Sequence, residues 1–200
     1  MNICKCPKVI MTDISRGSLK KAEENCLRYD SEREYDLRLG NGIDVLKDGE
    51  VDTVVIAGMG GLLIADILDW DMRKSKSMKR YVLQPRNNVG KLRHYLAEKG
   101  FSIVKEGLVP EGKFICEILT VEKADWQGET PPYGAEFDYP ESLLTFENPY
   151  TGEYLRRKLR TEEQIYEKIT AGSSDGTLKS KECAARIKQL RYLIERLEEK

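Results

Sequence analysis

Residues 51–61, VDTVVIAGMGG, carry the strongest fold signal in this chain. The stretch begins with β-branched and apolar residues and ends in glycines at positions 58, 60 and 61. The apolar run predicts a strand over residues 51–57 that is buried on both faces of a sheet. The glycines indicate that the backbone turns tightly after the strand, or lets another group come close. Ligands of open α/β sheets bind at such strand ends, so we expect the chemistry of this chain here.

Size and composition fit one α/β domain with an appendage. The chain has 200 residues, a formal net charge of -1, 40% hydrophobic residues and 34% charged residues, which is enough to bury a core. No apolar run approaches the length of a membrane span, and the N-terminal MNICKCPKV has no hydrophobic signal core. We therefore expect a cytoplasmic protein with no membrane partner. The five cysteines lack paired spacing and His94 is the only histidine, so we expect reduced thiols and no metal site.

Strands and helices alternate along residues 1–125, which we interpret as the α/β domain. The pattern predicts strands at 8–13, 35–39, 51–57 and 80–83, and helices at 15–29, 62–68 and 89–99. A short helical piece is expected after the turn Gly40-Asn41-Gly42. Segments 101–108 and 114–121 predict a hairpin with Glu111-Gly112 in its turn. This order predicts a largely parallel sheet with one antiparallel edge strand.

The rest of the chain predicts a linker and a helical hairpin. Residues 126–150, from Trp126 onward, are rich in proline and aromatic residues and predict a linker that packs against the domain. Residues 151–200 predict two antiparallel helices, and they hold 12 Lys and Arg against 9 acidic residues. The second helix has a coiled-coil seam of Cys183, Ile187, Leu190, Ile194 and Leu197. This pair fits packing or dimerisation, and it equally fits an arm that reaches along a large substrate.

Four successive strand ends carry residues suited to a nucleotide. Asp13 could accept hydrogen bonds from both hydroxyls of a ribose, or it could be a helix cap or a surface carboxylate. Asn41 could face an adenine edge, or it could belong to a plain turn. The glycine loop and Gln84-Pro85, with asparagines close behind, end the next two strands. Because the carboxyl ends of parallel strands meet at one rim of a sheet, the four together favour a ligand site.

These motifs resemble a known family. MTDIS before a helix, RLGNGIDVL, VDTVVIAGMGG, YVLQPRNNVGKLRHYL, GKFICEIL and the C-terminal helical hairpin are similar, in this order, to the bacterial tRNA (adenine 22-N1)-methyltransferases. The resemblance covers nearly the whole chain. It implies a class I methyltransferase fold, S-adenosylmethionine as the cofactor, tRNA as the partner, and methylation of N1 of adenine 22. The protein would be a monomer or a weak homodimer.

The resemblance also implies site residues. The cofactor would be held by Asp13, Ile14, Gly40, Asn41, Gly42, Ala57 and Gly58. The family usually has Asp where this chain has Asn41, which can still form hydrogen bonds but carries no charge. Methyl donor and base would meet at Gly58, Met59, Gly60, Gln84 and Pro85. The RNA would contact Asn88, Arg156, Arg157, Arg160, Lys179, Lys181, Arg186 and Lys188.

The chain departs from the family at its start. The family begins with a helix, a strand and a loop of roughly DIGSDHAYLP that cradles the methionine half of the cofactor, and this chain has none of them. Residues 1–6 resemble the end of the helix that follows that loop. We therefore expect an N-terminally truncated sheet that lacks a strand between residues 8–13 and 51–57. Either these strands close up, or another chain fills the space, or the true start codon lies upstream.

Two other functions are compatible with parts of this sequence. A catalytically inactive fragment, or an RNA-binding or oligomerising protein that keeps the fold, would also carry these strand-end loops. A nucleotide-dependent oxidoreductase would need a GxGxxG motif after its first strand, and GMGG has the wrong spacing. His94 falls between Leu92 and Leu96 in a predicted helix, so we expect it to be structural or exposed rather than catalytic.

Overall fold

The computed structural model describes residue 6 and residues 8–29, 34–124, 128–146, 148–172 and 177–199. Its strands are β1 (Lys8–Asp13), β2 (Glu34–Leu39), β3 (Thr53–Met59), β4 (Arg80–Pro85), β5 (Phe101–Glu111) and β6 (Phe114–Lys123). Its helices are α1 (Arg16–Tyr29), α2 (Gly61–Trp70), α3 (Met72–Ser75), α4 (Val89–Glu98), α5 (Ala135–Asp138), α6 (Ser142–Thr145), α7 (Thr151–Gly172) and α8 (Leu178–Glu198). The described residues leave out most of the helix end that is expected at residues 1–6. They also leave out Trp126 and residues 173–176 of the turn between the last two helices.

The described residues form two compact units. The first unit comprises residues 1–52 and 66–78, and the second comprises residues 53–65 and 79–200. Helix α2 contributes to both, because the boundary falls inside it.

The first unit is built on a parallel strand pair. β1 and β2 pair in register from Lys8↔Glu34 to Asp13↔Leu39, so both strands end at the same level. α1 follows β1, and the Ser15 hydroxyl accepts a hydrogen bond of 3.3 Å from the backbone N–H of Ser18, which caps the helix as expected. The carboxyl ends of β1 and β2 therefore place Asp13 beside the turn that begins at residue 40.

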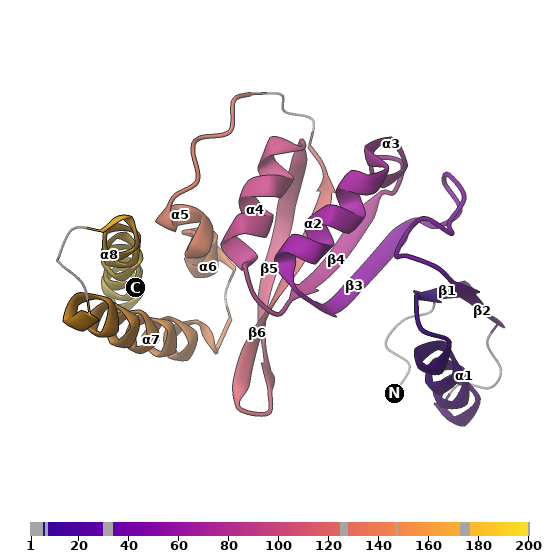
Figure 1. Cartoon of the computed structure of the whole chain (residues 1–200), viewed down its shortest axis with the longest axis horizontal. Coiled ribbons are helices and arrows are strands. Elements are labelled where there is room, and N and C mark those ends of the chain that lie inside the picture. Colours follow the sequence, from indigo (N-terminus) through magenta and orange to yellow (C-terminus); the bar gives the residue numbers. More distant parts are fainter. Residues whose placement is uncertain are drawn as a thin grey trace. The chain divides into compact units, whose positions relative to one another are not determined.

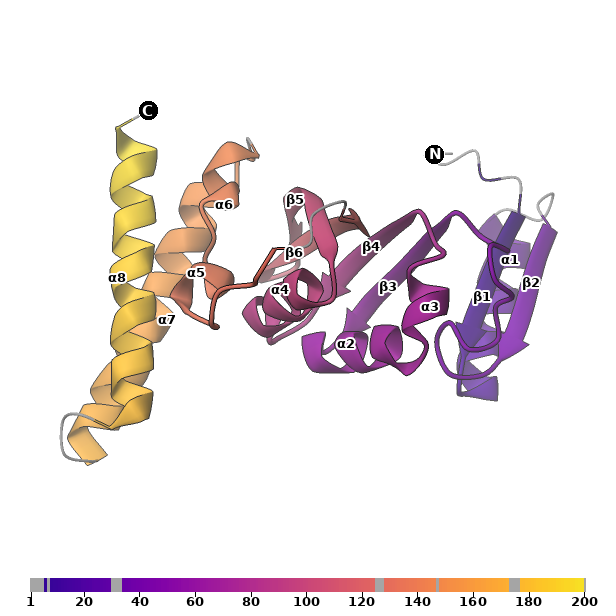
Figure 2. The ribbon, with the colours of Figure 1, turned by 90° about the horizontal axis from the view of Figure 1, so that it is seen from above.

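The second unit contains a four-stranded sheet in the order β3-β4-β6-β5. β3 and β4 are parallel, while β6 is antiparallel to both of its neighbours. α2 and α4 lie against one face of this sheet (Figures 1 and 2). The β5–β6 hairpin extends past the ends of β3 and β4 (Figure 1). The predicted hairpin is thus confirmed, with its Gly112 at φ 58° in the turn.

Three expectations need correction. The strand that runs antiparallel to its neighbours is not at the edge of the sheet, because β6 lies between β4 and β5. The described strands form two sheets, and β1 does not pair with β3, the two strands between which a missing strand is expected. β3 is not buried on both faces: Ile56 is buried but Val55 is 68% exposed, since an edge strand covered by helices on one face buries only alternate residues. Turns, rather than a helical piece, follow Gly42.

The C-terminal helices pack against each other and against the segment that precedes them (Figure 2). The predicted seam of α8 is largely confirmed, since Cys183 and Leu190 are fully buried and Ile187 is 9% exposed. Tyr139 and Leu143, from the proline-rich segment, pack into one cluster with the two helices and with β5. The described part of the predicted linker is therefore packed. No described helix is long and apolar enough to cross a membrane.

Candidate active site

The loops that follow β3 and β4 are joined by hydrogen bonds. The backbone N–H of Gly58 donates to Oε1 of Gln84 at 2.7 Å. The N–H of Arg86 donates to the carbonyl oxygen of Met59 at 2.8 Å. Residues predicted to lie at two neighbouring strand ends therefore form one continuous wall.

Gly60 and Gly61 allow this close approach. The N–H of Gly61 donates to the carbonyl oxygen of Asn87 at 3.0 Å. A Cβ on Gly61 would lie 2.6 Å from the carbonyl oxygen of Asn88, and a Cβ on Gly60 would lie 2.9 Å from Oδ1 of Asn87. Both distances are shorter than van der Waals contact. Gly61 is thus required by the packing of the loops, because it meets backbone, whereas Gly60 meets only the end of the exposed Asn87 side chain.

Gly58 differs from its neighbours, because its backbone needs glycine while the space beside it is open. Its φ is 77°, in the left-handed region that side chains rarely adopt. A Cβ built on it would meet no atom within 4 Å. The wall is therefore accessible at Gly58, where a ligand can approach the backbone.

Gln84 is held from two sides. Its side-chain oxygen accepts the bond from Gly58, and its side chain also contacts the thiol of Cys116 on β6. Burial and a hydrogen bond from this thiol to Glu111 raise the pKa of Cys116, so the neutral thiol donates to Glu111 and Gln84 meets its sulfur. Asn88, at φ 50°, begins α4 directly after this wall. The sequence predicted the positions of Gln84 and Asn88, and the structure adds that Gln84 fixes Gly58.

The second group of predicted site residues comes together in the first unit. The N–H of Gly40 donates to the carbonyl oxygen of Asp13 at 3.0 Å, and the hydroxyl of Thr12 donates to the carbonyl oxygen of Gly42 at 2.8 Å. Oδ1 of Asp13 accepts a hydrogen bond of 2.7 Å from the N–H of Ser15. The end of β1 and the 40–42 turn thus lie together, with Asp13 oriented by its own loop.

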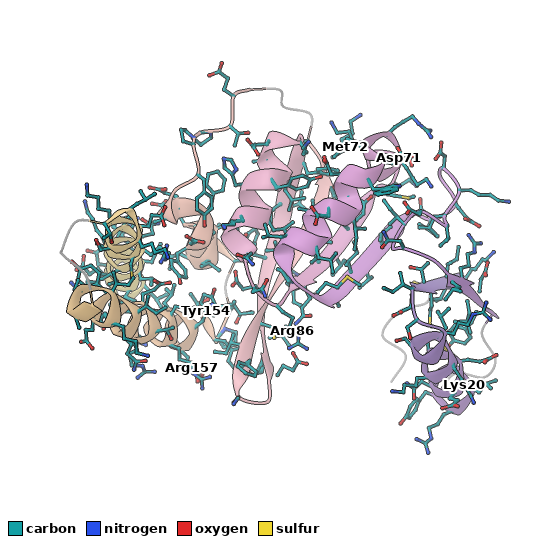
Figure 3. All side chains as sticks on the ribbon, viewed as in Figure 1. Lys20, Asp71, Met72, Arg86, Tyr154 and Arg157 are labelled. Carbon is teal, nitrogen blue, oxygen red and sulfur yellow. The ribbon has the colours of Figure 1, made fainter. Side chains whose placement is uncertain are left out.

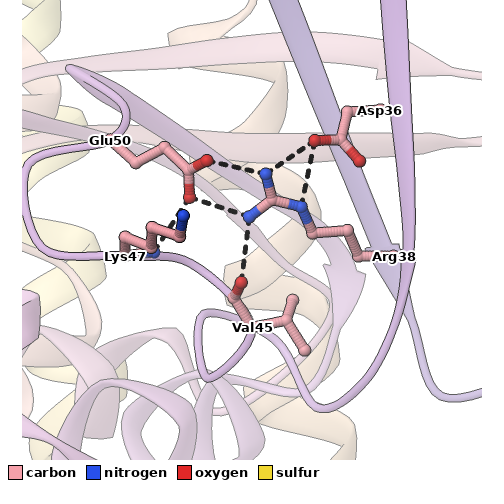
Figure 4. Close-up of polar contacts among 5 residues, drawn as sticks. All are labelled: Asp36, Arg38, Val45, Lys47 and Glu50. Atoms are coloured by element: carbon pink, nitrogen blue, oxygen red, sulfur yellow. Dashed lines mark hydrogen bonds and ion pairs between the residues drawn. The ribbon is translucent and has the colours of Figure 1, made fainter.

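Arg38 on β2 anchors the segment that follows this turn (Figure 4). Its guanidinium binds the Asp36 and Glu50 carboxylates, each at 2.6 Å, and donates to the carbonyl oxygen of Val45 at 2.9 Å. The hydrogen bond from Arg38, with a further one from the N–H of Lys47, lowers the pKa of Glu50 to about 2. These contacts hold residues 45–50 in turns, which explains why the expected helical piece does not form.

The predicted methyl-transfer and cofactor residues thus fall into two sets. One set lies in the first unit: Asp13, Ile14, Gly40, Asn41 and Gly42. The other lies in the second unit: Ala57, Gly58, Met59, Gly60, Gln84 and Pro85, with the predicted RNA contact Asn88 in the same unit. The structure brings each set together within its own unit.

The predicted RNA contacts on the helical hairpin divide by their partners. Arg156 pairs with Glu198, Arg157 with Glu153, and Arg186 with Glu162. Arg157, labelled in Figure 3, also donates to the carbonyl oxygen of Lys113 at 2.9 Å. The remaining four are exposed and have no ion pair with any described residue: Arg160, Lys179, Lys181 and Lys188. These four side chains are therefore open to solvent and carry charges that no described residue pairs with.

A buried ionic network beside the site was missed by sequence reasoning. Arg93 on α4 binds Glu106 at 3.0 Å and Glu117 at 2.6 Å, and its side chain is 3% exposed. The Tyr154 hydroxyl on α7 donates to Glu117 at 2.5 Å. The sequence carried one signal for this network, because Arg93 shares the apolar side of its helix with Leu92 and Leu96.

His94 has a structural role, as expected. Its Nε2 lies 3.1 Å from the carbonyl oxygen of Pro131, and its ring packs edge-on against Tyr133 and Phe137. It therefore fastens the proline-rich segment to α4. Among the described residues, no group of His, Cys, Asp and Glu side chains is arranged to hold a metal ion.

Comparisons with known proteins give the family. The family model of tRNA (adenine(22)-N(1))-methyltransferases, TrmK, matches residues 1–199. The tRNA (adenine(22)-N(1))-methyltransferase of Bacillus subtilis (strain 168) is 28% identical over 200 residues, covering 96% of this chain and 82% of that protein.

Solved structures show the same fold. A Streptococcus agalactiae protein of the NADB-Rossmann superfamily aligns with a TM-score of 0.79 and 27% identity, over 94% of this chain and 80% of that chain. Streptococcus pneumoniae Sp1610, solved in complex with S-adenosyl-L-methionine, aligns with a TM-score of 0.76 and 24% identity, over 94% of this chain and 81% of that chain.

The fold is that of a Rossmann-like α/β methyltransferase with two packed C-terminal helices. Within this class, the chain belongs to the TrmK family of tRNA (adenine(22)-N(1))-methyltransferases.

Proposed function

We propose that this chain transfers a methyl group from S-adenosylmethionine to N1 of adenine 22 in tRNA. The observation that carries the proposal is the family match over residues 1–199, which includes both strand-end loops and both C-terminal helices. The wall formed by the loops after β3 and β4 supports it, because this wall is rigid and yet open beside Gly58.

Residues of the first unit suit the adenosine part of the cofactor. No described residue donates to Oδ2 of Asp13, which leaves this oxygen for a ribose hydroxyl. Asn41 is exposed between two glycines and can offer its amide to the adenine edge. Ile14, which is 76% exposed, offers apolar surface beside them. In the second unit, Ala57 and Gly58 would contact the cofactor next to the methyl group.

The chemistry needs alignment more than it needs a nucleophilic side chain. When bound, S-adenosylmethionine supplies a methyl group on a positively charged sulfur, and its transfer to the N1 lone pair leaves a neutral thioether and a positive charge on the adenine. Carbonyl oxygens of Gly58, Met59 and Gly60 suit the offsetting of that charge. Gln84 acts as a positioning residue, because its bond to Gly58 holds this backbone in place. Pro85 would bound the space for the base.

The RNA must present its base unpaired. N1 of adenine is occupied in a Watson–Crick pair, so exposing it costs a few kcal/mol unless the base is already free. Asn88, at the start of α4, would contact the exposed nucleotide. The four exposed cations of α7 and α8 would bind phosphates, with Arg156, Arg157 and Arg186 adding charge from within their ion pairs. Binding of tRNA would then weaken steeply as the salt concentration rises.

We expect a monomer or weak homodimer that acts in the cytoplasm.

Two measurements test this function. Calorimetric titration should show binding of S-adenosylmethionine, and labelled methyl groups should pass from it to an unmodified tRNA transcript with adenine at position 22. A transcript with guanine at position 22 is the matched control and should stay unlabelled. If tRNA binds but neither cofactor binding nor transfer occurs, the chain is an RNA-binding or oligomerising protein that keeps the fold, and the proposed activity is wrong.

A further inference from the structure

The second unit contains a cleft between the end of its sheet and its helical pair. The cleft has a volume of about 670 Å³, within the range of ligand pockets. One wall is formed by residues 85–91, at and after the end of β4, and by the first residues of β6, Phe114–Glu117. The other is formed by α5, α7 and α8. Figure 3 labels Arg86 and Tyr154, which come from the two walls. The cleft thus begins at the loop proposed to receive the target base.

The buried network makes this cleft rigid. Tyr154 of α7 binds Glu117 of β6, which in turn binds Arg93 of α4. Arg93 also donates to the carbonyl oxygen of Phe137 at 3.1 Å. No buried side-chain nitrogen or oxygen in the described part of the chain lacks a partner. Both walls are therefore fixed relative to each other, so a ligand would meet a preformed site.

An aromatic ring lines this cleft at a distance from the target loop. Phe114 is 58% exposed, which is unusual for a large apolar side chain. The last β4–β6 pair is Leu83↔Leu119. At ~3.3 Å per residue, Pro85 lies ~7 Å and Phe114 ~16 Å beyond that pair along the strands. A base in van der Waals contact with Pro85 therefore cannot stack on Phe114, but its neighbour in the RNA chain can.

Two lysines in the walls of the cleft form no ion pair with a described residue and are available to bind a phosphate. Three of its carboxylates have partners: Glu117 binds Arg93, Glu162 binds Arg186, and Asp138 accepts from the Tyr133 hydroxyl at 2.7 Å. The fourth, Glu182, is exposed at the rim and has no ion pair within the described structure. Lys91 and Lys158 stand in the two walls, and neither forms an ion pair with a described residue. The Lys158 ammonium lies 5.2 Å from the centre of the Tyr154 ring.

We propose that this cleft binds the unpaired nucleotide next to the target adenine, with its base stacked on Phe114 and its phosphate near Lys158. The inference rests on the proposed function, whose site it extends from the target base to a second nucleotide. Stacking on an aromatic ring accepts any base, so this contact would contribute affinity and position rather than sequence preference.

Binding of tRNA to variants of the full chain tests the stacking contact. Phe114→Leu should weaken tRNA binding about 10-fold, as expected for the loss of one base–aromatic stack. Phe114→Trp keeps a stacking surface and should bind as the native chain does. Val109→Ala, on the same hairpin and 49% exposed, is the control and should have no effect. All variants should keep the native affinity for S-adenosylmethionine.

An RNA without the flanking base makes the test specific. Two tRNAs are compared, one with an abasic residue at position 21 and one with an abasic residue at position 23. We expect one of the two to bind the native chain about 10-fold more weakly than the intact tRNA. That tRNA should lose no further affinity when Phe114→Leu replaces the native chain, because both changes remove the same contact. Affinity losses that multiply would overturn the proposal, and so would equal losses of tRNA affinity for Phe114→Leu and Phe114→Trp.

The result also separates this inference from the proposed function. If the native chain shows the coupling between Phe114 and a flanking base but transfers no methyl group, the proposed activity fails and the nucleotide site stands. If it methylates adenine 22 while Phe114→Leu binds tRNA normally, the nucleotide site fails alone.

Discussion

The backbone N–H of Gly58 donates a hydrogen bond of 2.7 Å to the side-chain oxygen of Gln84. This bond connects the loop after β3 to the end of β4, where the family resemblance predicts that methyl donor and base meet. The sequence motifs alone do not show that Gly58 and Gln84 depend on each other. Gly58 needs its left-handed backbone, and Gln84 holds that backbone in place.

Gly58→Ala should reduce methyl transfer at least tenfold. The φ of 77° costs an alanine about 1–2 kcal/mol, and relaxation of this strain would move the carbonyl oxygens of the wall. Gly49→Ala is the matched control, because Gly49 has φ 66° and also has open space around it. Both variants should lose similar thermal stability, and only Gly58→Ala should lose activity. Equal activities would argue against a role for this loop.

Asp13→Ala should weaken S-adenosylmethionine binding about tenfold or more in calorimetry. Its Oδ2 is the oxygen left for the ribose hydroxyls, and a hydrogen bond to a charged group contributes about 1.5–3 kcal/mol. Glu23→Ala, an exposed substitution on α1, should leave the affinity unchanged. An unchanged affinity for Asp13→Ala would mean that Asp13 only stabilises its own turn, through the hydrogen bond from the N–H of Ser15.

Much of the fold follows from local sequence signals. The strand at 8–13 and the helix from 89 onward were predicted closely, because a short apolar run and a terminal Gly100 are local features. The tight packing of residues 60 and 61 against Asn87 and Asn88 could not be predicted, since it depends on a loop 26 residues away. The sequence has glycines at both positions, and the structure shows that the packing against backbone requires the one at position 61.

Long-range ionic contacts explain most of what the sequence did not predict. Residues after Gly42 lack a helix because Arg38 on β2 binds the carbonyl oxygen of Val45 and the carboxylate of Glu50. The periodicity of α4 places Arg93 beside Leu92 and Leu96, but only the tertiary structure brings Glu106 of β5 and Glu117 of β6 to it. The periodicity therefore indicates that Arg93 is buried and does not reveal its partners.

Arg93→Met should destabilise the second unit by about 3–5 kcal/mol, because it leaves the carboxylates of Glu106 and Glu117 buried without a cation. Arg80→Met is the control: it breaks an exposed pair with Glu122 on the same sheet and should cost less than about 1 kcal/mol. Urea denaturation measures both.

Glu50 makes the first unit sensitive to acid. Hydrogen bonds from Arg38 and Lys47 lower its pKa from 4.5 to about 2, so its contribution to stability is present above the unfolded-state pKa and is lost as pH falls towards 2. Glu50→Gln should therefore show a smaller fall in melting temperature between pH 5 and pH 2 than the native chain. Glu24→Gln, on α1, should behave as the native chain does. Parallel curves for Glu50→Gln and the native chain would contradict this assignment.

The single-turnover rate of Gln84→Met tests the central claim most directly, with tRNA and S-adenosylmethionine both saturating. Methionine has a similar length, but its thioether is only a weak acceptor for the N–H of Gly58, so the loop carbonyls should lose their alignment. We predict that the rate of methyl transfer to adenine 22 falls about 100-fold while the affinities for tRNA and cofactor stay within about twofold of the native values. A native rate at saturation would contradict the assignment of methyl transfer to this wall.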